Sequence, residues 1–442
     1  VQFDKNVEEG LKWLHALEQK AQRHHDLRAL ASVYHSTTGI LCWKGDFHGA
    51  ISESQQALEL FTKIGDVKHE GWSLGGIGWA FLSLGDLQRA SEYVYRSCEI
   101  AERVGSKRDI ASSYTFIGVI LLCQGSREKA IDAFQKAIQL FQEIGSPWGT
   151  WSGLSLGRVY LAAGKRPEAL RQFQELVPMA KTDPVLLAAA LSGLEEAYED
   201  AEEFRSFCHR FREEHPEFSN SSLVQWFLEP TEAKDFPKNL FYDGFVGSLS
   251  PSWAWHDPFG DCSFRVQNGI EIHAANGRDL WWLNFSAPRI LQSASGNFAA
   301  QTVCSPLSPP VDGGNTMGED KPAIGGLLLW KDKDNFLRLE TKDRDEIRFE
   351  VHVAGQGAVI GRGHLHSKRV FLRLERLGSR VSALCSADGV SWFTVGYVEF
   401  PIEDPVEIGL IAIGNIDRTI YHGAFPEGTA IRFESFELYA AE

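Results

Sequence analysis

The acid-rich segment Glu340-Thr341-Lys342-Asp343-Arg344-Asp345-Glu346 holds the carboxylates that come closest to a hydrolytic pattern. Glycoside hydrolysis uses two carboxylates that flank the scissile bond. A Glu-x-Asp-x-Glu spacing on one strand would place three carboxylates in a single cleft, because alternate residues share a face. The spacing here differs from that pattern, and the segment falls at a predicted hairpin tip. We therefore expect no catalytic pair and predict that the protein is not an enzyme.

Two groups of side chains offer metal ligands. Asp332, Asp334 and Asn335 could supply oxygens to calcium, but the same residue types are the usual formers of turns. His364 and His366 are expected on one strand face, without a third ligand at a metal-binding spacing. A turn is the favoured interpretation of the first group, so we predict neither a metal nor any other cofactor.

The segment Gly277-Arg278-Asp279-Leu280-Trp281-Trp282-Leu283-Asn284 is the strongest candidate for an exposed binding surface. Neighbouring residues on a strand face opposite sides, so either Trp281 or Trp282 is expected to point away from the core. An exposed tryptophan beside Arg278 and Asp279 would stack on a sugar or act as a hot spot for a protein partner. The alternative, a second small core beneath a loop, stays equally open.

Charge and cysteine usage narrow the class of partner. Acidic residues exceed basic ones by 59 to 44, with no basic stripe set aside for phosphates, so nucleic acid is not an expected ligand. No GxxxxGK[ST] motif occurs, which excludes a P-loop site within this sequence. The seven cysteines fall in no metal-binding spacing, which is typical of reduced thiols in the cytoplasm. No segment reaches the length of a membrane span.

The N-terminal half repeats about every forty residues. One glycine series stands before the second helix of each unit, at Gly45, Gly85, Gly125 and Gly164. A second series marks the other turn, and a third lies inside each first helix, at Gly39, Gly78, Gly118 and Gly157. Glycine can take the positive φ that ends a helix, and Asp or Ser beside it can cap the next one. Each unit is therefore predicted to be a helical hairpin.

Two stretches carry a specific family resemblance. Leu156-Gly157-Arg158-Val159-Tyr160 with Phe173, and Ala130-Ile131-Asp132-Ala133-Phe134 with Ala137, resemble the tetratricopeptide signature. The long period is similar to the repeats of bacterial regulators and signal-transduction ATPases with numerous domains. This resemblance implies an all-α superhelix over residues 1–215, whose concave groove binds a protein partner. Full hairpins are expected at about 27–65, 67–105, 107–145 and 147–181.

Four tryptophans in the predicted first helices are candidates for the lining of that groove. They are Trp72, Trp79, Trp148 and Trp151. Since each one lies in a helix that must also pack against its neighbours, burial in the array core is the favoured alternative.

The periodicity changes to two in the C-terminal part. Residues 216–238 are predicted to form a linker, and residues 239–442 to form strands. In Val370-Phe371-Leu372-Arg373-Leu374-Glu375-Arg376 apolar and polar residues alternate as on a half-buried strand. Roughly a dozen such strands, separated by turn signals, predict an antiparallel sandwich of two sheets.

A second resemblance concerns this sandwich. The segments Phe241-Tyr242-Asp243-Gly244-Phe245 and Gly326-Leu327-Leu328-Leu329-Trp330, followed by Ser386-Ala387-Asp388-Gly389-Val390-Ser391-Trp392, look like a bacterial concanavalin-A-like family of unknown function. Some of its members are described as sugar-binding modules. The resemblance implies a jelly roll, with Trp392 in its core.

The predicted function is non-catalytic protein interaction and ligand sensing. The sequence is interpreted as the C-terminal sensor part of a larger bacterial signalling or defence protein, because it lacks a starting Met and joins a repeat array to a second recognition fold. Its partner would be another protein, or upstream domains of the same polypeptide. The alternative is a lectin-like module in which the sandwich binds a glycan and the repeats present it.

Overall fold

The computed structural model describes residues 7–180, 184–214, 230–281, 283–305, 307, 322–342 and 345–440. The chain divides into two compact units: residues 1–199 together with 417–426, and residues 200–416 together with 427–442. The predicted division into 1–215, 216–238 and 239–442 stays a prediction, since most of its linker lies outside the described residues. No described helix has the length and apolar character needed to cross a bilayer.

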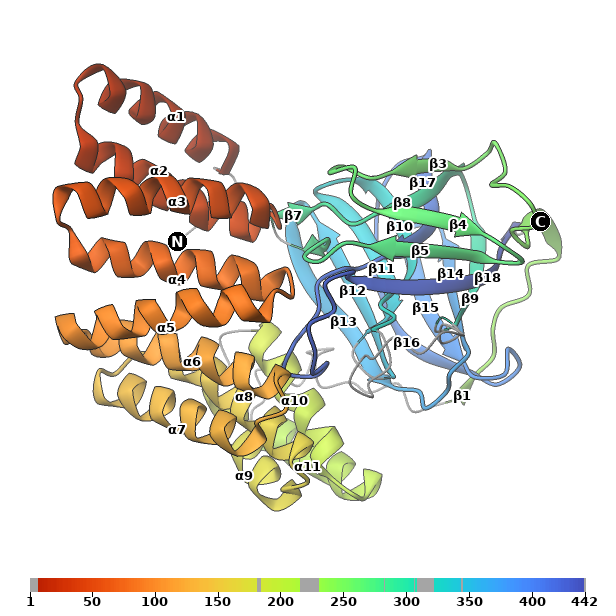
Figure 1. Cartoon of the computed structure of the whole chain (residues 1–442). Helices are drawn as coiled ribbons and strands as arrows, with labels where there is room; N and C mark the ends of the chain where they lie inside the picture. Colours follow the sequence, from red (N-terminus) through yellow and green to blue (C-terminus); the bar gives the residue numbers. More distant parts are fainter. Residues whose placement is uncertain are drawn as a thin grey trace. The chain divides into compact units, whose positions relative to one another are not determined.

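Eleven helices form the N-terminal region within the described residues (Figure 1). They are α1 (Val7–Arg23), α2 (Leu27–Trp43), α3 (Phe47–Ile64), α4 (Val67–Ser83), α5 (Leu87–Val104), α6 (Lys107–Cys123), α7 (Arg127–Glu143), α8 (Gly149–Ala162), α9 (Arg166–Met179), α10 (Pro184–Ala197) and α11 (Ala201–Glu214). From α1 to α9, each helix packs against the next one along the chain. The helical repeat prediction is confirmed, with the four full hairpins as α2–α3, α4–α5, α6–α7 and α8–α9.

The turns form as the residue types predict where Asp stands before the new helix, but not where Ser does. Asp46, Asp66 and Asp86 each accept a hydrogen bond from the backbone N–H three residues further on, which satisfies a free donor of the new helix. Gly65 ends α3 in the left-handed conformation, with φ of 72°. Ser126, in contrast, makes no such side-chain bond at the start of α7, so Asp is the more effective cap in these repeats.

The glycines inside the first helices permit close packing. A Cβ atom on Gly118 would lie 2.8 Å from the Phe134 ring, and one on Gly157 would lie 2.6 Å from the Phe173 ring. Both phenylalanines are fully buried in the second helix of the same hairpin. The helices therefore approach to a distance that any larger residue would prevent.

Two antiparallel sheets form the C-terminal part. The order in the larger sheet is β1 (Pro230–Thr231), β16 (Trp392–Glu399), β15 (Arg380–Ser386), β14 (Val370–Leu377), β9 (Phe298–Ser305), β18 (Thr429–Ala440), β5 (Ile270–Ala274) and β4 (Ser263–Val266), with β2 (Lys238–Asp243) also paired to β18. The order in the second sheet is β13 (Gln356–His364), β12 (Glu346–Val353), β11 (Asn335–Thr341), β10 (Gly325–Asp332), β17 (Val406–Ala412), β8 (Arg289–Ala294) and β3 (Ala254–His256). A short hairpin pairs β6 (Leu280–Trp281) with β7 (Asn284–Phe285).

The two sheets enclose one apolar core. Leu337 and Leu339 of β11 and Leu372 and Leu374 of β14 belong to the same buried cluster, so the predicted two-sheet sandwich is confirmed. Trp392 is only 6% exposed, but the expectation that it lies in this core is wrong: it is not part of the apolar cluster, and the Arg373 guanidinium lies 5.9 Å from its ring centre. The polar residues that alternate with Leu337 and Leu339 face the other side of the second sheet.

Replacing Gly118 with Ala is expected to destabilise the repeats by about 1–3 kcal/mol, because the added methyl group overpacks against Phe134. Thermal unfolding of the full chain, followed by far-UV circular dichroism, measures the change in Tm.

The matched control is Gly39→Ala in α2, where a Cβ atom meets nothing within 4 Å. This variant should gain about 1 kcal/mol, since Ala favours the helix more than Gly does. A loss of stability at both positions would contradict the proposed role of Gly118 in close packing.

Candidate functional site

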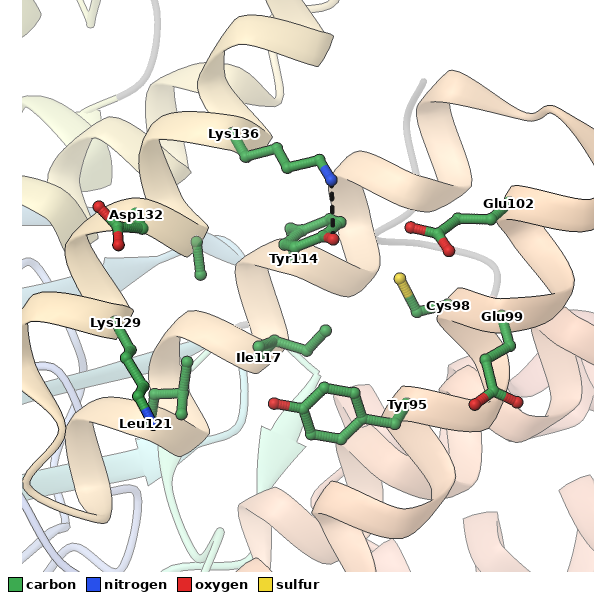
Figure 2. A pocket seen from close by; sticks show the side chains of 11 residues that line it. Tyr95, Cys98, Glu99, Glu102, Tyr114, Ile117, Leu121, Lys129, Asp132 and Lys136 are labelled. Carbon is green, nitrogen blue, oxygen red and sulfur yellow. Dashed lines mark hydrogen bonds between the residues drawn. The ribbon is translucent and has the colours of Figure 1, made fainter.

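A pocket of about 360 Å³ opens on the helical array, with α6 lying between α5 and α7 (Figure 2). Its lining residues are Tyr95, Cys98, Glu99 and Glu102 of α5, Tyr114, Ile117 and Leu121 of α6, and Lys129, Asp132, Ala133 and Lys136 of α7. On α5 and α7 these residues fall at positions i, i+3, i+4 and i+7, and on α6 at i, i+3 and i+7, so each helix presents one continuous face.

The inner wall of the pocket is part of the array core. Cys98, Ile117 and Ala133 belong to one buried cluster, and the Leu121 side chain packs on it. The wall is thus apolar and held by the packing of three helices, which makes the pocket a preformed feature.

The rims carry charges of both signs. Glu99 and Glu102 stand on the α5 side, and Lys129 and Asp132 on the α7 side (Figure 2). All four are exposed, and within the described part of the chain none of them makes a side-chain hydrogen bond or an ion pair. These charges therefore remain available to a ligand.

Lys136 is held over the mouth of the pocket by a tyrosine. Its Nζ donates a hydrogen bond of 2.8 Å to the Tyr114 hydroxyl and lies 4.2 Å from the centre of the same ring. The hydrogen bond raises the pKa of Lys136, so the ammonium group stays charged at neutral pH.

Burial raises the pKa of the Cys98 thiol, in the wall of the pocket, to about 11. That thiol is therefore protonated at neutral pH, and the pocket is suited to binding rather than to nucleophilic chemistry.

The four predicted groove tryptophans lie outside this pocket. Trp72 of α4 stacks on His35 with ring centres 5.8 Å apart, and Trp79 meets the edge of Trp43 at 6.2 Å. Both are half-buried and fill the space between α2 and α4, as the packing alternative predicts.

Trp148 and Trp151 behave differently. They are 54% and 39% exposed at the start of α8, so the core-packing alternative is wrong for this pair. Their participation in binding stays a prediction.

The two charged residues expected to frame an exposed surface around Trp281 are buried. Arg278 and Asp279 are only 4% and 5% exposed. Arg278 pairs with Asp261 at 2.5 Å, while Asp279 accepts hydrogen bonds from Arg338 at 3.0 Å and from Asn415 at 2.9 Å. Internal partners thus occupy the two side chains that were expected to frame a ligand.

The aromatic side chains of this hairpin pack inward. Trp281 is half-buried and meets His352 edge-on with ring centres 5.2 Å apart, and Phe285 meets Phe336 at 6.3 Å. Leu280 is fully buried. Trp281 and Leu280 are thus packed as the second small core would require. Because Trp282 lies outside the described residues, the choice between the two arrangements stays a prediction.

Sequence reasoning missed a buried group of charges on the outer face of the second sheet. Arg338 donates through Nε and Nη2 to Glu350, at 2.8 and 2.5 Å, and its Nη1 lies 3.6 Å from a Glu340 oxygen. All three residues are at most 2% exposed. Arg348 joins the group through Glu350 at 3.3 Å and Glu346 at 3.0 Å.

The signal for this group lies in the strand register. Arg338 stands directly opposite Glu350, and Glu340 directly opposite Arg348. Opposite charges stabilise one another across neighbouring strands. The sequence shows an Arg and a Glu two residues apart in each of the two strands. Which Arg meets which Glu follows only from the register in which β11 and β12 pair.

Glu340 and Glu350 have opposite electrostatic environments. Burial raises the pKa of Glu340 to about 7, and neither of its oxygens accepts a hydrogen bond in the described structure. Burial also opposes ionisation of Glu350, but Arg338 outweighs it, so the pKa of Glu350 is lowered. Both carboxyl groups are enclosed, so burial favours the protonated form of Glu340 while Arg338 favours the ionised form of Glu350.

The candidate metal ligands form internal bonds. The Asp332 carboxylate accepts hydrogen bonds from the Asp334 N–H and the Asn335 amide, which confirms the predicted turn.

A second group of possible metal ligands was not predicted from the sequence. Asp257, Asp261 and Cys262 offer ligand atoms within 4.8 Å of one another. Asp261 is bound by Arg278, however, and burial raises the pKa of Cys262 to about 12, which disfavours the thiolate that a metal requires.

Comparison with known proteins supports the helical part. Residues 30–103 and 109–182 match the family model of the tetratricopeptide repeat. A Tonsoku-like protein of Bos taurus is 28% identical over 177 residues, which cover 38% of this chain and 13% of that protein. Tetratricopeptide repeat protein 29 of Trypanosoma brucei brucei is 25% identical over 126 residues, covering 28% of this chain and 26% of that protein. The chain therefore spans at most about a quarter of these curated relatives.

Solved structures resemble parts of the chain. A Signal Transduction ATPase with Numerous Domains from Pyrococcus horikoshii, with a tetratricopeptide repeat sensor, has 22% identity and a TM-score of 0.41, and the match covers 50% of this chain and 35% of that one. A Rap protein complexed with Competence and Sporulation Factor has 17% identity and a TM-score of 0.35, covering 48% and 63%. A xylan beta-1,4-xylosidase of Bacillus halodurans C-125 has 14% identity and a TM-score of 0.33, covering 48% and 41%. None of these partial likenesses carries an argument about function.

The Glu340→Gln variant should lose part of the pH dependence of stability. Because the pKa of Glu340 is about 7 in the folded chain and ordinarily 4.5, the folded chain binds more protons than the unfolded chain between these values. The free energy of unfolding therefore falls as the pH rises through this window. Glu340→Gln should reduce the fall by about 1–3 kcal/mol, measured by urea unfolding on both sides of the window.

Glu92→Gln, at an exposed position of α5, controls for the loss of one carboxylate. The assignment fails if both variants keep the same decline in stability as the parent chain.

Proposed function

We propose that the tetratricopeptide repeats within residues 30–182 give this chain a non-catalytic binding function, in which the pocket between α5 and α7 receives a segment of a protein partner. Repeats of this type act through extended surfaces of stacked hairpins. The observation that carries the proposal is the pocket itself, with an apolar wall between rims of exposed, unpaired charges.

The size and lining of the pocket indicate the chemistry of the partner segment. A volume of about 360 Å³ suits a few side chains rather than a folded domain. Ile117 and Leu121 would contact an apolar side chain of the partner. Glu99 and Glu102 would attract a basic residue on the α5 side, and Lys129 an acidic one on the α7 side. A short peptide with an apolar centre and flanking charges fits these requirements.

The wider function that we propose is ligand sensing within a larger bacterial signalling or defence protein. Binding of a partner in the pocket would be its input, and the partner could be another protein or upstream domains of the same polypeptide. The joining of a repeat array to a second fold supports this function. All seven cysteines are thiols, which supports a cytoplasmic location.

The alternative is a lectin-like module in which the sandwich binds a glycan and the repeats present it, and the described residues give it less support. It required exposed polar side chains beside a tryptophan, and Arg278 and Asp279 are enclosed by Asp261, Arg338 and Asn415. No other described feature favours it.

A charge reversal in the pocket tests the proposal. Peptides selected from a displayed random library against the full chain should lose at least about tenfold in affinity, or about 1.4 kcal/mol, for the Glu102→Lys variant. Isothermal titration calorimetry with the selected synthetic peptides measures the Kd.

The matched control is Glu128→Lys, which reverses an exposed charge of α7 outside the pocket lining and should leave the Kd unchanged. Selected peptides that bind both variants as tightly as the parent chain would show that the pocket is not the binding site.

A further inference from the structure

Residues 417–426 belong to the first unit, although they lie between β17 and β18 in the sequence. We call them the docking segment. Arg418, Ile420 and Phe425 of this segment are 6%, 6% and 7% exposed. The segment is therefore not an exposed loop.

Arg418 binds the end of a repeat helix. Its Nη2 donates a hydrogen bond of 3.0 Å to the backbone carbonyl of Ser83, the last residue of α4. The carbonyl groups at the C-terminal end of a helix carry partial negative charge and lack partners within the helix. A guanidinium group is therefore a suitable cap for this end of α4.

Gly85 accommodates the docking segment by having no side chain. A Cβ atom there would lie 1.9 Å from the Ala424 carbonyl oxygen. Gly125 and Gly164 hold the equivalent turn positions, with the same positive φ, and a Cβ atom on either would meet nothing within 4 Å. The repeat pattern accounts for a positive φ at all three turns, but only the docking segment accounts for the close approach at Gly85.

A second helix end completes the contact. The Cys123 thiol, at the end of α6, donates a hydrogen bond of 3.8 Å to the Arg418 carbonyl and is 2% exposed. Ser83, Gly85 and Cys123 therefore form one surface from the ends of two successive first helices. We call this surface the turn-edge site.

The docking segment is folded by its own bonds. The Arg418 guanidinium also donates to the Gly423 and Ala424 carbonyls, at 3.0 and 2.7 Å, and the Tyr421 N–H donates to the Asp417 carbonyl at 2.9 Å. A turn that is closed by its own arginine loses less conformational entropy when it binds. The segment thus has the properties of a preorganised ligand.

We propose that the turn-edge site is a second protein-docking site of the array, which recognises an arginine-containing turn, and that the docking segment occupies it within the same chain. A covalently attached ligand acts at an effective concentration that is roughly millimolar for a short tether. A protein that presents the same arginine turn would therefore bind only by displacing the docking segment. This site is separate from the pocket, so the proposal does not depend on what the pocket binds.

The first test compares Gly85→Ala with Gly125→Ala in the full chain by hydrogen exchange and mass spectrometry. Both variants place alanine at a positive φ, so their backbone strain is matched, but only Gly85→Ala collides with Ala424. Amides of residues 417–426 should exchange about tenfold or more faster in Gly85→Ala, and Cys123 should become reactive towards maleimide. The same exchange rates in both variants would overturn the proposal.

The second test adds a head-to-tail cyclic peptide of residues 417–426 to a full chain in which that segment is replaced by Gly/Ser residues of equal number. The peptide should bind this chain and show no saturable binding to the parent chain. Its Arg418→Lys form should bind at least about tenfold more weakly, because an ammonium group lacks the planar fork that reaches several carbonyls. Equal binding of the two peptides would refute recognition of an arginine turn. So would the absence of peptide binding to the Gly/Ser-substituted chain, provided that its helical circular dichroism is unchanged.

Discussion

The constraint on which most of the array depends is the contact between a glycine inside α4, α6 and α8 and a side chain of the helix that follows. Gly78 meets Val94, Gly118 meets Phe134, and Gly157 meets Phe173, all at distances that exclude a larger residue. This contact fixes α6 closely against α7, and the apolar wall of the pocket is the surface left between that hairpin and α5. The pocket is therefore a consequence of repeat packing, and only its charged rims are specific to this pair of repeats.

In the sandwich the corresponding constraint is electrostatic. Arg338 is enclosed with Asp279, Glu340 and Glu350, and in such surroundings the removal of one partner would leave an uncompensated buried charge. Asp279, just before the β6–β7 hairpin, is bound by this group, and Trp281 of the hairpin packs on His352. A segment whose composition suggests a ligand-binding surface serves here to close a second, partly polar core.

The two proposed binding sites use different parts of the same repeat. The pocket uses side chains from the faces of three helices, so its specificity follows from residue type. The turn-edge site uses the Ser83 backbone carbonyl and the missing side chain of Gly85, so its specificity follows from shape and from the Arg418 guanidinium. A repeat protein can thus add a binding site at its turns without changing the residues that hold its helices together.

The sequence by itself determined the helical hairpins, the turn positions and the alternating strands, because these depend on residues close together in the chain: a glycine beside an aspartate, or a leucine every second position. The tertiary structure decided the burial of Arg278 and Asp279, the assembly of the charged group around Arg338, and the position of the docking segment. Arg338 and Glu350 meet only through strand register, and Arg418 reaches Ser83 across 335 residues. Local spacing carries no information about such encounters, since the packing of distant elements selects which polar side chains are enclosed and which remain free to bind.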